Sequence, residues 1–81
     1  CSHRTEGNIK LWFRDLRKGA AFDFTRNGFS KIVNITSIED DRISFKEDKI
    51  QFTLDKGQRK LIKETQGSVV FFYCELNEFR M

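Results

Sequence analysis

Short runs of alternating apolar and polar residues dominate this chain, and turn-forming residues separate them at regular intervals. β-branched and aromatic residues fill these runs, which is typical of β-strands. Asn27-Gly28 is the clearest turn signal, because a two-residue type I′ hairpin requires positive φ at both central positions. The pattern predicts an all-β fold with strands over 8–13, 20–26, 29–37, 49–54 and 68–76.

Two further segments and the last strand remain open to more than one interpretation. Residues 43–45 form a short apolar piece, and residues 58–64 fit either a strand or one helical turn. The last strand, SVVFFYCEL, is apolar on both faces. It is therefore either central and covered on both sides, or one of its faces is a contact surface.

A chain of 81 residues holds one modest core and no second domain. Five short antiparallel strands favour a small closed barrel, because closure removes the exposed edges of a flat sheet. We expect residues 1–6 to be disordered, residues 7–77 to form the barrel and residues 78–81 to be a tail.

The cysteine and apolar content predicts a soluble, cytoplasmic protein with no metal, cofactor or membrane partner. The longest uncharged apolar stretch, Val69 to Cys74, is too short to span a membrane, and residues 1–10 lack the apolar centre of a secretory signal. Cys74 suits a buried free thiol and Cys1 a frayed terminus, with a bridge between them as the open alternative. One histidine, His3, and two cysteines do not make a four-ligand zinc site.

The net charge of +3 arises entirely in residues 1–27, which hold six Lys or Arg against three acids, whereas residues 28–81 hold nine of each sign. These cations interleave with Trp12 and several Phe residues. Cations that offset phosphate charge and rings that accept unstacked bases suit single-stranded nucleic acid. The alternative is that the rings fill the core and the cations are the solvated face of the same strands.

Several segments match a known motif pattern in order along the chain. Residues 7–13 end in Lys-Leu-Trp-Phe, residues 18–24 stand at a K-G-F-G-F-I motif, and residues 31–38 stand at V-F-V-H-F-S-A-I. Residues 7–60 thereby resemble the cold-shock domain. This resemblance implies a five-stranded Greek-key barrel of the OB class that binds single-stranded nucleic acid. Ile32 and Asn34 replace the Phe and His of the second motif, so the aromatic platform is thinner than in that family.

The charge pattern and the resemblance together predict the binding residues. Trp12 and Phe22 would stack bases with Phe24 or Phe29 as a third ring, cations would neutralise phosphates, and Asn34 would offer an amide to a base edge. Phe22 and Phe24 face either the binding surface, in two possible alignments, or the core with Asp23 outside. The predicted site comprises Lys10, Trp12, Arg14, Lys18, Phe22, Phe24, Phe29, Lys31 and Asn34.

The first functional hypothesis is a module that binds single-stranded RNA or DNA with little sequence preference. The second is a protein-interaction barrel, such as an accessory domain, that has lost the nucleic-acid face and contacts a partner protein or a second copy through the last strand. We do not expect an enzyme, because the acids at 39–41 and 47–48 are turn residues and one histidine cannot activate a nucleophile.

Overall fold

The computed structural model describes residues 1–74 and the strand at 79–80, and this part of the chain contains nine strands. Alternating apolar residues define most of them, because every second side chain points to the same face of a strand. The strands are β1 (Ser2–His3), β2 (Gly7–Phe13), β3 (Ala21–Arg26), β4 (Phe29–Glu39), β5 (Arg42–Glu47), β6 (Ile50–Asp55), β7 (Lys60–Thr65), β8 (Ser68–Tyr73) and β9 (Phe79–Arg80).

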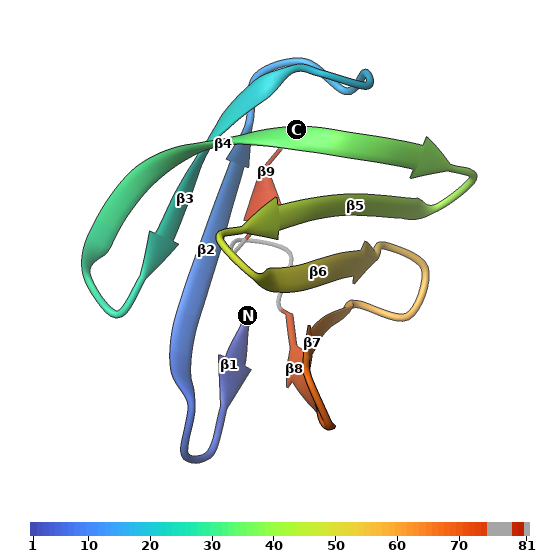
Figure 1. The fold of residues 1–81 in the computed structure, drawn as a ribbon. Coiled ribbons are helices and arrows are strands. Elements are labelled where there is room, and N and C mark those ends of the chain that lie inside the picture. The colour runs from blue at the N-terminus through green and yellow to red at the C-terminus, as the bar shows by residue number, and fades with distance from the viewer. Residues whose placement is uncertain (75–78, 81) are drawn as a thin grey trace.

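From β2 to β8 each strand pairs antiparallel with the next, and β1 pairs with both β2 and β8, which closes the barrel (Figure 1). The long strand β4 crosses from one side of the barrel to the other. Its first part pairs with β3 and its second with β5, with a register shift between Ile35 and Ser37. β9 pairs in parallel with β2.

The all-β barrel predicted from the sequence is confirmed, but the five-stranded Greek-key arrangement is wrong in strand number and order. From β1 to β8 consecutive strands are neighbours in the sheet, so this part of the chain follows a meander. Residues 43–45 are the centre of a full strand, β5, and residues 58–64 contribute mainly to β7. The expected last strand, 68–76, ends at Tyr73, and residues 75 and 76 lie outside the described residues.

The Asn27-Gly28 hairpin is confirmed. Asn27 has a φ of 50° and Gly28 a φ of 87°, as the type I′ geometry requires. Two other short hairpin turns also use a positive φ at a residue that tolerates it, at Asp40 and at Asp48. The turn residues therefore explain why the strands reverse where they do.

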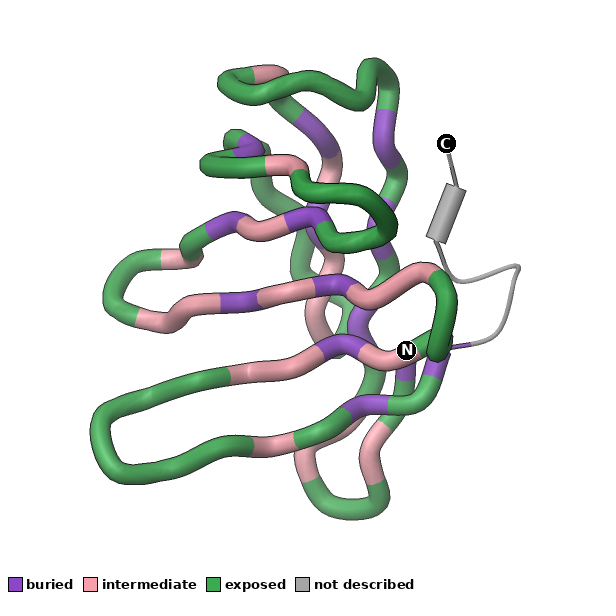
Figure 2. Tube along the Cα trace, turned by 90° about the vertical axis from the view of Figure 1, so that its right-hand side faces the viewer, coloured by how far each residue is buried: buried purple, intermediate pink, exposed green. Residues whose placement is uncertain are grey.

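The inward side chains of β2 to β8 form one core that is rich in phenylalanine. Buried and exposed positions alternate along the strands (Figure 2). Phe45 lies at the centre of the aromatic cluster, stacked on Phe52 at a centroid distance of 5.2 Å and in edge contact with Phe22 at 4.9 Å. These rings fill the barrel interior.

The N-terminal residues belong to the barrel, which corrects the expectation that 1–6 are disordered. Cys1 is fully buried and forms a disulfide with Cys74, so neither cysteine is a free thiol. The backbone amide of Ile9 also donates a hydrogen bond to the Cys1 carbonyl at 2.7 Å. Of the expected tail, residues 78 and 81 lie outside the described residues, and Phe79–Arg80 form β9.

Candidate binding surfaces

The outer surface of β2, β3 and β4 carries part of the predicted nucleic-acid site. Trp12 pairs across the sheet with Asp23, which pairs in turn with Ile32, so the three side chains share one face. Trp12 is 41% exposed and Ile32 is 58% exposed. We call this surface the β2–β4 face; its outward residues are Lys10, Trp12, Asp23, Thr25, Ser30, Ile32 and Asn34.

The cations near this face differ in how strongly they are held. Lys10 and Lys18 are exposed, and neither forms an ion pair within the described residues. Arg14 donates from Nη2 to both carboxylate oxygens of Asp23, at 3.2 and 3.0 Å. Both side chains of that pair are largely solvated, so the pair adds little stability, but it neutralises Arg14 beside the indole.

Phe22 and Phe24 do not contribute to this surface, which corrects their assignment as stacking rings. Both are fully buried. Phe22 packs against Phe13 at a centroid distance of 4.6 Å, and Phe24 packs against Phe52 at 5.4 Å. Asp23 lies outside instead, so β3 follows the ordinary alternation of a half-buried strand. Of the four rings predicted to bind bases, only Trp12 remains on the β2–β4 face.

The side chain of Asn34 forms a hydrogen bond within the barrel. Its amide Nδ2 donates to the carbonyl oxygen of Gly19 at 2.9 Å, and the Gly19 amide donates to the carbonyl of Ile35 at 2.8 Å. These bonds hold the loop between β2 and β3 against β4. The Asn34 amide is therefore already used in fixing the chain.

Phe29 and Lys31 lie at one end of the barrel and not on the β2–β4 face. Both fall on the inward side of β4, in step with Val33 and Ile35, but beyond the core. Phe29 is 83% exposed and lines a groove of about 360 Å³ together with Arg26, Asn27, Ser30, Lys31 and Glu47. The two exposed rings of the predicted site are therefore far from sharing one surface: Trp12 lies on the β2–β4 face, and Phe29 lies at the end of the barrel.

Lys31 belongs to a charged cluster that covers this end of the barrel. Its Nζ lies 3.1 Å from Glu47 and 3.7 Å from Asp48, and Arg26 Nη1 donates to Glu47 Oε1 at 3.0 Å. The hydrogen bond to Glu47 raises the pKa of Lys31 above its usual value of 10.5. The Glu47 side chain, which is only 10% exposed, thus pairs with Arg26 and with Lys31, the one of these two cations that the sequence assigned to phosphate binding.

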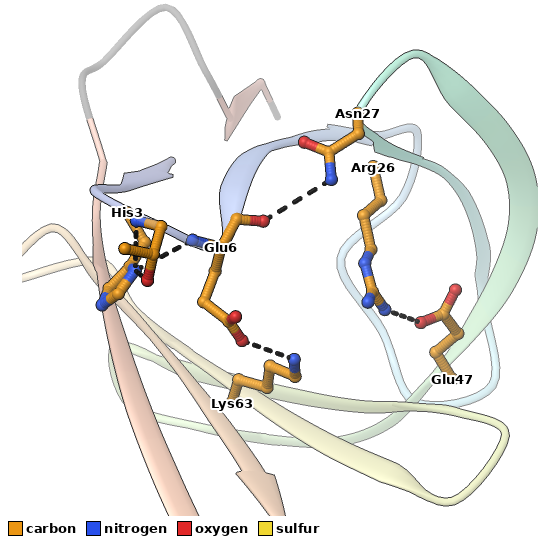
Figure 3. Close-up of polar contacts among 7 residues, drawn as sticks. His3, Glu6, Arg26, Asn27, Glu47 and Lys63 are labelled. Carbon is orange, nitrogen blue, oxygen red and sulfur yellow. Dashed lines mark hydrogen bonds and ion pairs between the residues drawn. The ribbon is translucent and has the colours of Figure 1, made fainter.

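A second ion pair lies at the same end. Lys63 Nζ donates to Glu6 Oε1 at 2.8 Å, and Figure 3 shows this pair together with Arg26 and Glu47. The hydrogen bond from Lys63 lowers the pKa of Glu6 below 4.5. Sequence reasoning missed both pairs, although Lys63 follows Leu61 and Glu47 follows Phe45 at inward positions of their strands.

Three exposed large hydrophobic residues lie together on β8, where the sequence predicted a contact surface as one alternative. Phe72 and Cys74 face the core, whereas Val69, Phe71 and Tyr73 point outward and are 56%, 47% and 65% exposed. Ile62 of β7 pairs directly with Phe71. We call this surface the β7–β8 face; its residues are Lys60, Ile62, Glu64, Val69, Phe71 and Tyr73.

A groove of about 630 Å³ runs along the β1 side of this face. Its walls are Val69, Val70, Phe71 and Tyr73 on one side and Ser2, His3 and Arg4 on the other. Lys60 Nζ stands 6.0 Å from the centre of the Tyr73 ring. The groove thus joins apolar side chains of β8 to a polar edge formed by β1.

Comparison of the chain with protein-family models, curated proteins and solved structures gives no match. Among residues 1–74 and 79–80 there is no cluster of His, Cys, Asp and Glu that could hold a metal ion. Within the same residues there is no helix long and apolar enough to cross a membrane. The β2–β4 face and the β7–β8 face are therefore the features of the molecule from which a function can be inferred.

Proposed function

We propose that this chain is a protein-interaction module that contacts its partner through the β7–β8 face. The observation that carries the proposal is the stripe of Val69, Phe71 and Tyr73, exposed side by side on one strand. Contiguous apolar surface on a small protein is costly in water and is typical of interaction sites. These three side chains do not pack in the core, because β8 contributes Phe72 and Cys74 to the core from its opposite face.

Site-specific photo-crosslinking tests this function. A photoreactive phenylalanine analogue replaces Phe71 in one variant and Phe29 in a matched control, because Phe29 is an equally large exposed ring at a distant place. We expect irradiation in the native extract to join a polypeptide, identified by mass spectrometry, at position 71 and not at position 29. Equal yields at both positions, or no adduct at position 71, would contradict the proposal.

Single-stranded nucleic-acid binding is the second candidate function, and the partial exposure of Trp12 near Lys10 supports it. Lys10 and Lys18, with Arg14 released from Asp23, would give about three phosphate contacts, and the affinity should then fall with log salt at a slope of about −2. One stacking ring and few base-edge contacts imply little sequence preference. The resemblance to the cold-shock domain stays a prediction.

Titration of labelled oligonucleotides at two salt concentrations, followed by Trp12 fluorescence, tests this second function. Trp12→Leu should weaken binding by roughly 1–3 kcal/mol, whereas Phe29→Leu should leave it unchanged. Absence of quenching at low salt would reject it.

The disulfide bears on where the protein acts. Disulfides persist in oxidising compartments and are rare in the cytosol. The Cys1–Cys74 bond therefore favours an oxidising location over the cytoplasmic location predicted from the sequence. It also favours a protein partner over cytosolic RNA or DNA.

A further inference from the structure

The β7–β8 face carries a charge pattern that complements itself. Along β7 the outward residues run Lys60, Ile62 and Glu64, a cation and an anion on either side of an apolar centre. Their partners on β8 are Tyr73, Phe71 and Val69 respectively. Neither Lys60 nor Glu64 forms an ion pair within the described residues, and Lys60 Nζ lies over the Tyr73 ring at 6.0 Å from its centre.

We propose that a second copy of this chain docks on the β7–β8 face and forms a two-fold symmetric dimer. This inference rests on the proposed protein-interaction function and names its partner. A two-fold axis between the faces, perpendicular to the strands and level with the Ile62–Phe71 pair, reverses the strand direction of the second copy. Each Lys60 then meets the Glu64 of the other copy, and the two apolar centres meet each other.

The apolar and charged residues of the β7–β8 face are arranged like the centre and rim of a protein interface. Ile62 and Phe71 lie at the middle of the face, and the charged residues lie at its ends. The neighbouring strand β6 adds the polar side chains of Gln51 and Thr53, which pair with Glu64 and Ile62, and the carboxylate of Asp55, which lies beside Lys60 and is held by Arg42 at 3.8 Å. An apolar centre with a polar rim is the usual anatomy of a protein interface. Arg4, on the β1 side of the groove, belongs to this solvated rim.

The β2–β4 face does not offer the same complementarity. Lys10 lies on β2 before Trp12, and Arg14 follows the end of β2 and is already paired with Asp23. The same symmetry operation about Trp12 would bring Lys10 against an Arg14 that Asp23 already neutralises, so no new pair of opposite charges would form between the copies. Self-recognition therefore belongs to the β7–β8 face.

The size of the face sets the expected strength of the dimer. Strands of six residues span about 20 Å, and two strands are about 10 Å wide, so β7 and β8 alone present about 200 Å² of projected area per copy, an interface in the size range of weak, transient complexes. We expect a reversible dimer with a Kd of roughly 1 to 100 μM, for which small interfaces are typical. Association must therefore be measured over a wide concentration range.

Sedimentation equilibrium of the intact, oxidised chain from about 1 μM to about 1 mM brackets this affinity. The wild-type mass should rise from monomer to dimer. Phe71→Ser should weaken the dimer at least about 30-fold, because it removes the central ring from both copies. Phe29→Ser should leave the Kd unchanged, because Phe29 is exposed at the barrel end.

A charge exchange then tests the orientation of the two copies. Lys60→Glu and Glu64→Lys should each weaken the dimer about 10-fold, because each places like charges together at two symmetric contacts. The double variant restores the opposite pairs and should return to within about 3-fold of the wild-type Kd. Thermal unfolding of every variant checks that the barrel is intact.

Three outcomes would overturn the dimer: a monomer at every concentration, an unchanged mass for Phe71→Ser, or a double variant as weak as each single variant. A monomer whose position 71 crosslinks to a different polypeptide would overturn the dimer but leave the proposed function standing. A monomer with no adduct at position 71 would contradict both the dimer and the proposed protein-interaction function.

Discussion

Gly7 enters β2 with a φ of 92°, which L residues rarely adopt, and a Cβ at this position would collide with the carboxamide of Asn27. That carboxamide accepts a hydrogen bond from the Asn8 amide at 2.9 Å. Gly67 also has a positive φ, of 80°, but a Cβ there meets nothing within 4 Å. A side chain at residue 67 would therefore meet backbone strain alone, whereas a side chain at residue 7 would meet both backbone strain and a steric collision.

Gly67→Ala should lower the free energy of unfolding by about 1–2 kcal/mol, the cost of a left-handed conformation for an L residue. Gly7→Ala should cost about 3 kcal/mol or more, because the collision also displaces Asn27 from Asn8. Urea unfolding of both variants measures the difference. Equal losses would mean that the Asn27 contact does not constrain residue 7.

The Glu6–Lys63 pair predicts a pH dependence of stability. Because the pKa of Glu6 is lowered in the folded state, the unfolded chain binds this proton first as the pH falls. The contribution is therefore present above pH 4.5 and is lost as the pH falls through the folded pKa.

Glu6→Gln should lie below wild type in stability near neutral pH, and the gap should shrink as the pH falls below 4.5. Lys63→Met removes the same hydrogen bond and should reduce the acid dependence over the same range. Urea midpoints between about pH 7 and about pH 3 measure this effect. A gap that does not change with pH would show that the pair contributes no linked proton.

The orientation of Phe22 and Phe24 could be predicted from alternation but not from the family motif. Phe-Asp-Phe-Thr is the pattern of a half-buried strand with Asp23 outside, whereas the cold-shock resemblance favoured outward rings. The structure follows alternation, because burying two rings stabilises the core and leaves Asp23 solvated. Phe29 and Lys31 were harder to predict, since a strand's sequence does not tell where the core beneath it ends.

At the scale of elements, the two faces of β8 have different surroundings: one packs against the core and the other is exposed. Phe72 is 1% exposed and packs in the core, whereas its neighbour Phe71 is 47% exposed on the β7–β8 face. Phe72→Ala should lower the free energy of unfolding by about 3–5 kcal/mol, and Phe71→Ala by less than about 1 kcal/mol. Thermal or urea unfolding at protein concentrations below dimer formation measures both. A large loss for Phe71→Ala would place that ring in the core.

Strands were predictable where clear turn residues bounded a strongly alternating run. Asn27-Gly28 fixed the β3–β4 hairpin, and the alternation of Ile50, Phe52 and Leu54 identified β6. β5 and β7 were incomplete or ambiguous in the sequence, because each has few apolar residues among charged ones. Their inward charges, Glu47 and Lys63, close the barrel end through ion pairs that local pattern does not reveal.

At the scale of the whole molecule, closure of the barrel was predictable but strand order was not. Unpaired edges favour closure in any small sheet of this kind. The order depends on which distant strands pair, and alternation within a strand carries no information about its partner. β1 illustrates this limit, since two residues, Ser2 and His3, join β2 to β8.

The Cys1–Cys74 disulfide holds β1 in this position across a sequence separation of 73 residues. In the chain-entropy description, a closed loop of that length stabilises a protein by about 4 kcal/mol, largely by restricting the unfolded chain. Domains of this size have total stabilities near the lower end of about 5–15 kcal/mol. The reduced barrel should therefore be marginally stable.

A double variant, Cys1→Ser with Cys74→Ser, should lose about 4 kcal/mol and show a steeper dependence on urea, because its unfolded chain is more expanded. Wild type in a reductant should match it, and oxidised wild type should not. If the reduced barrel is mostly unfolded at 37 °C, the protein requires an oxidising compartment to act. Equal urea midpoints for the oxidised and reduced forms would remove that requirement, and the cytoplasm would again be compatible with the fold.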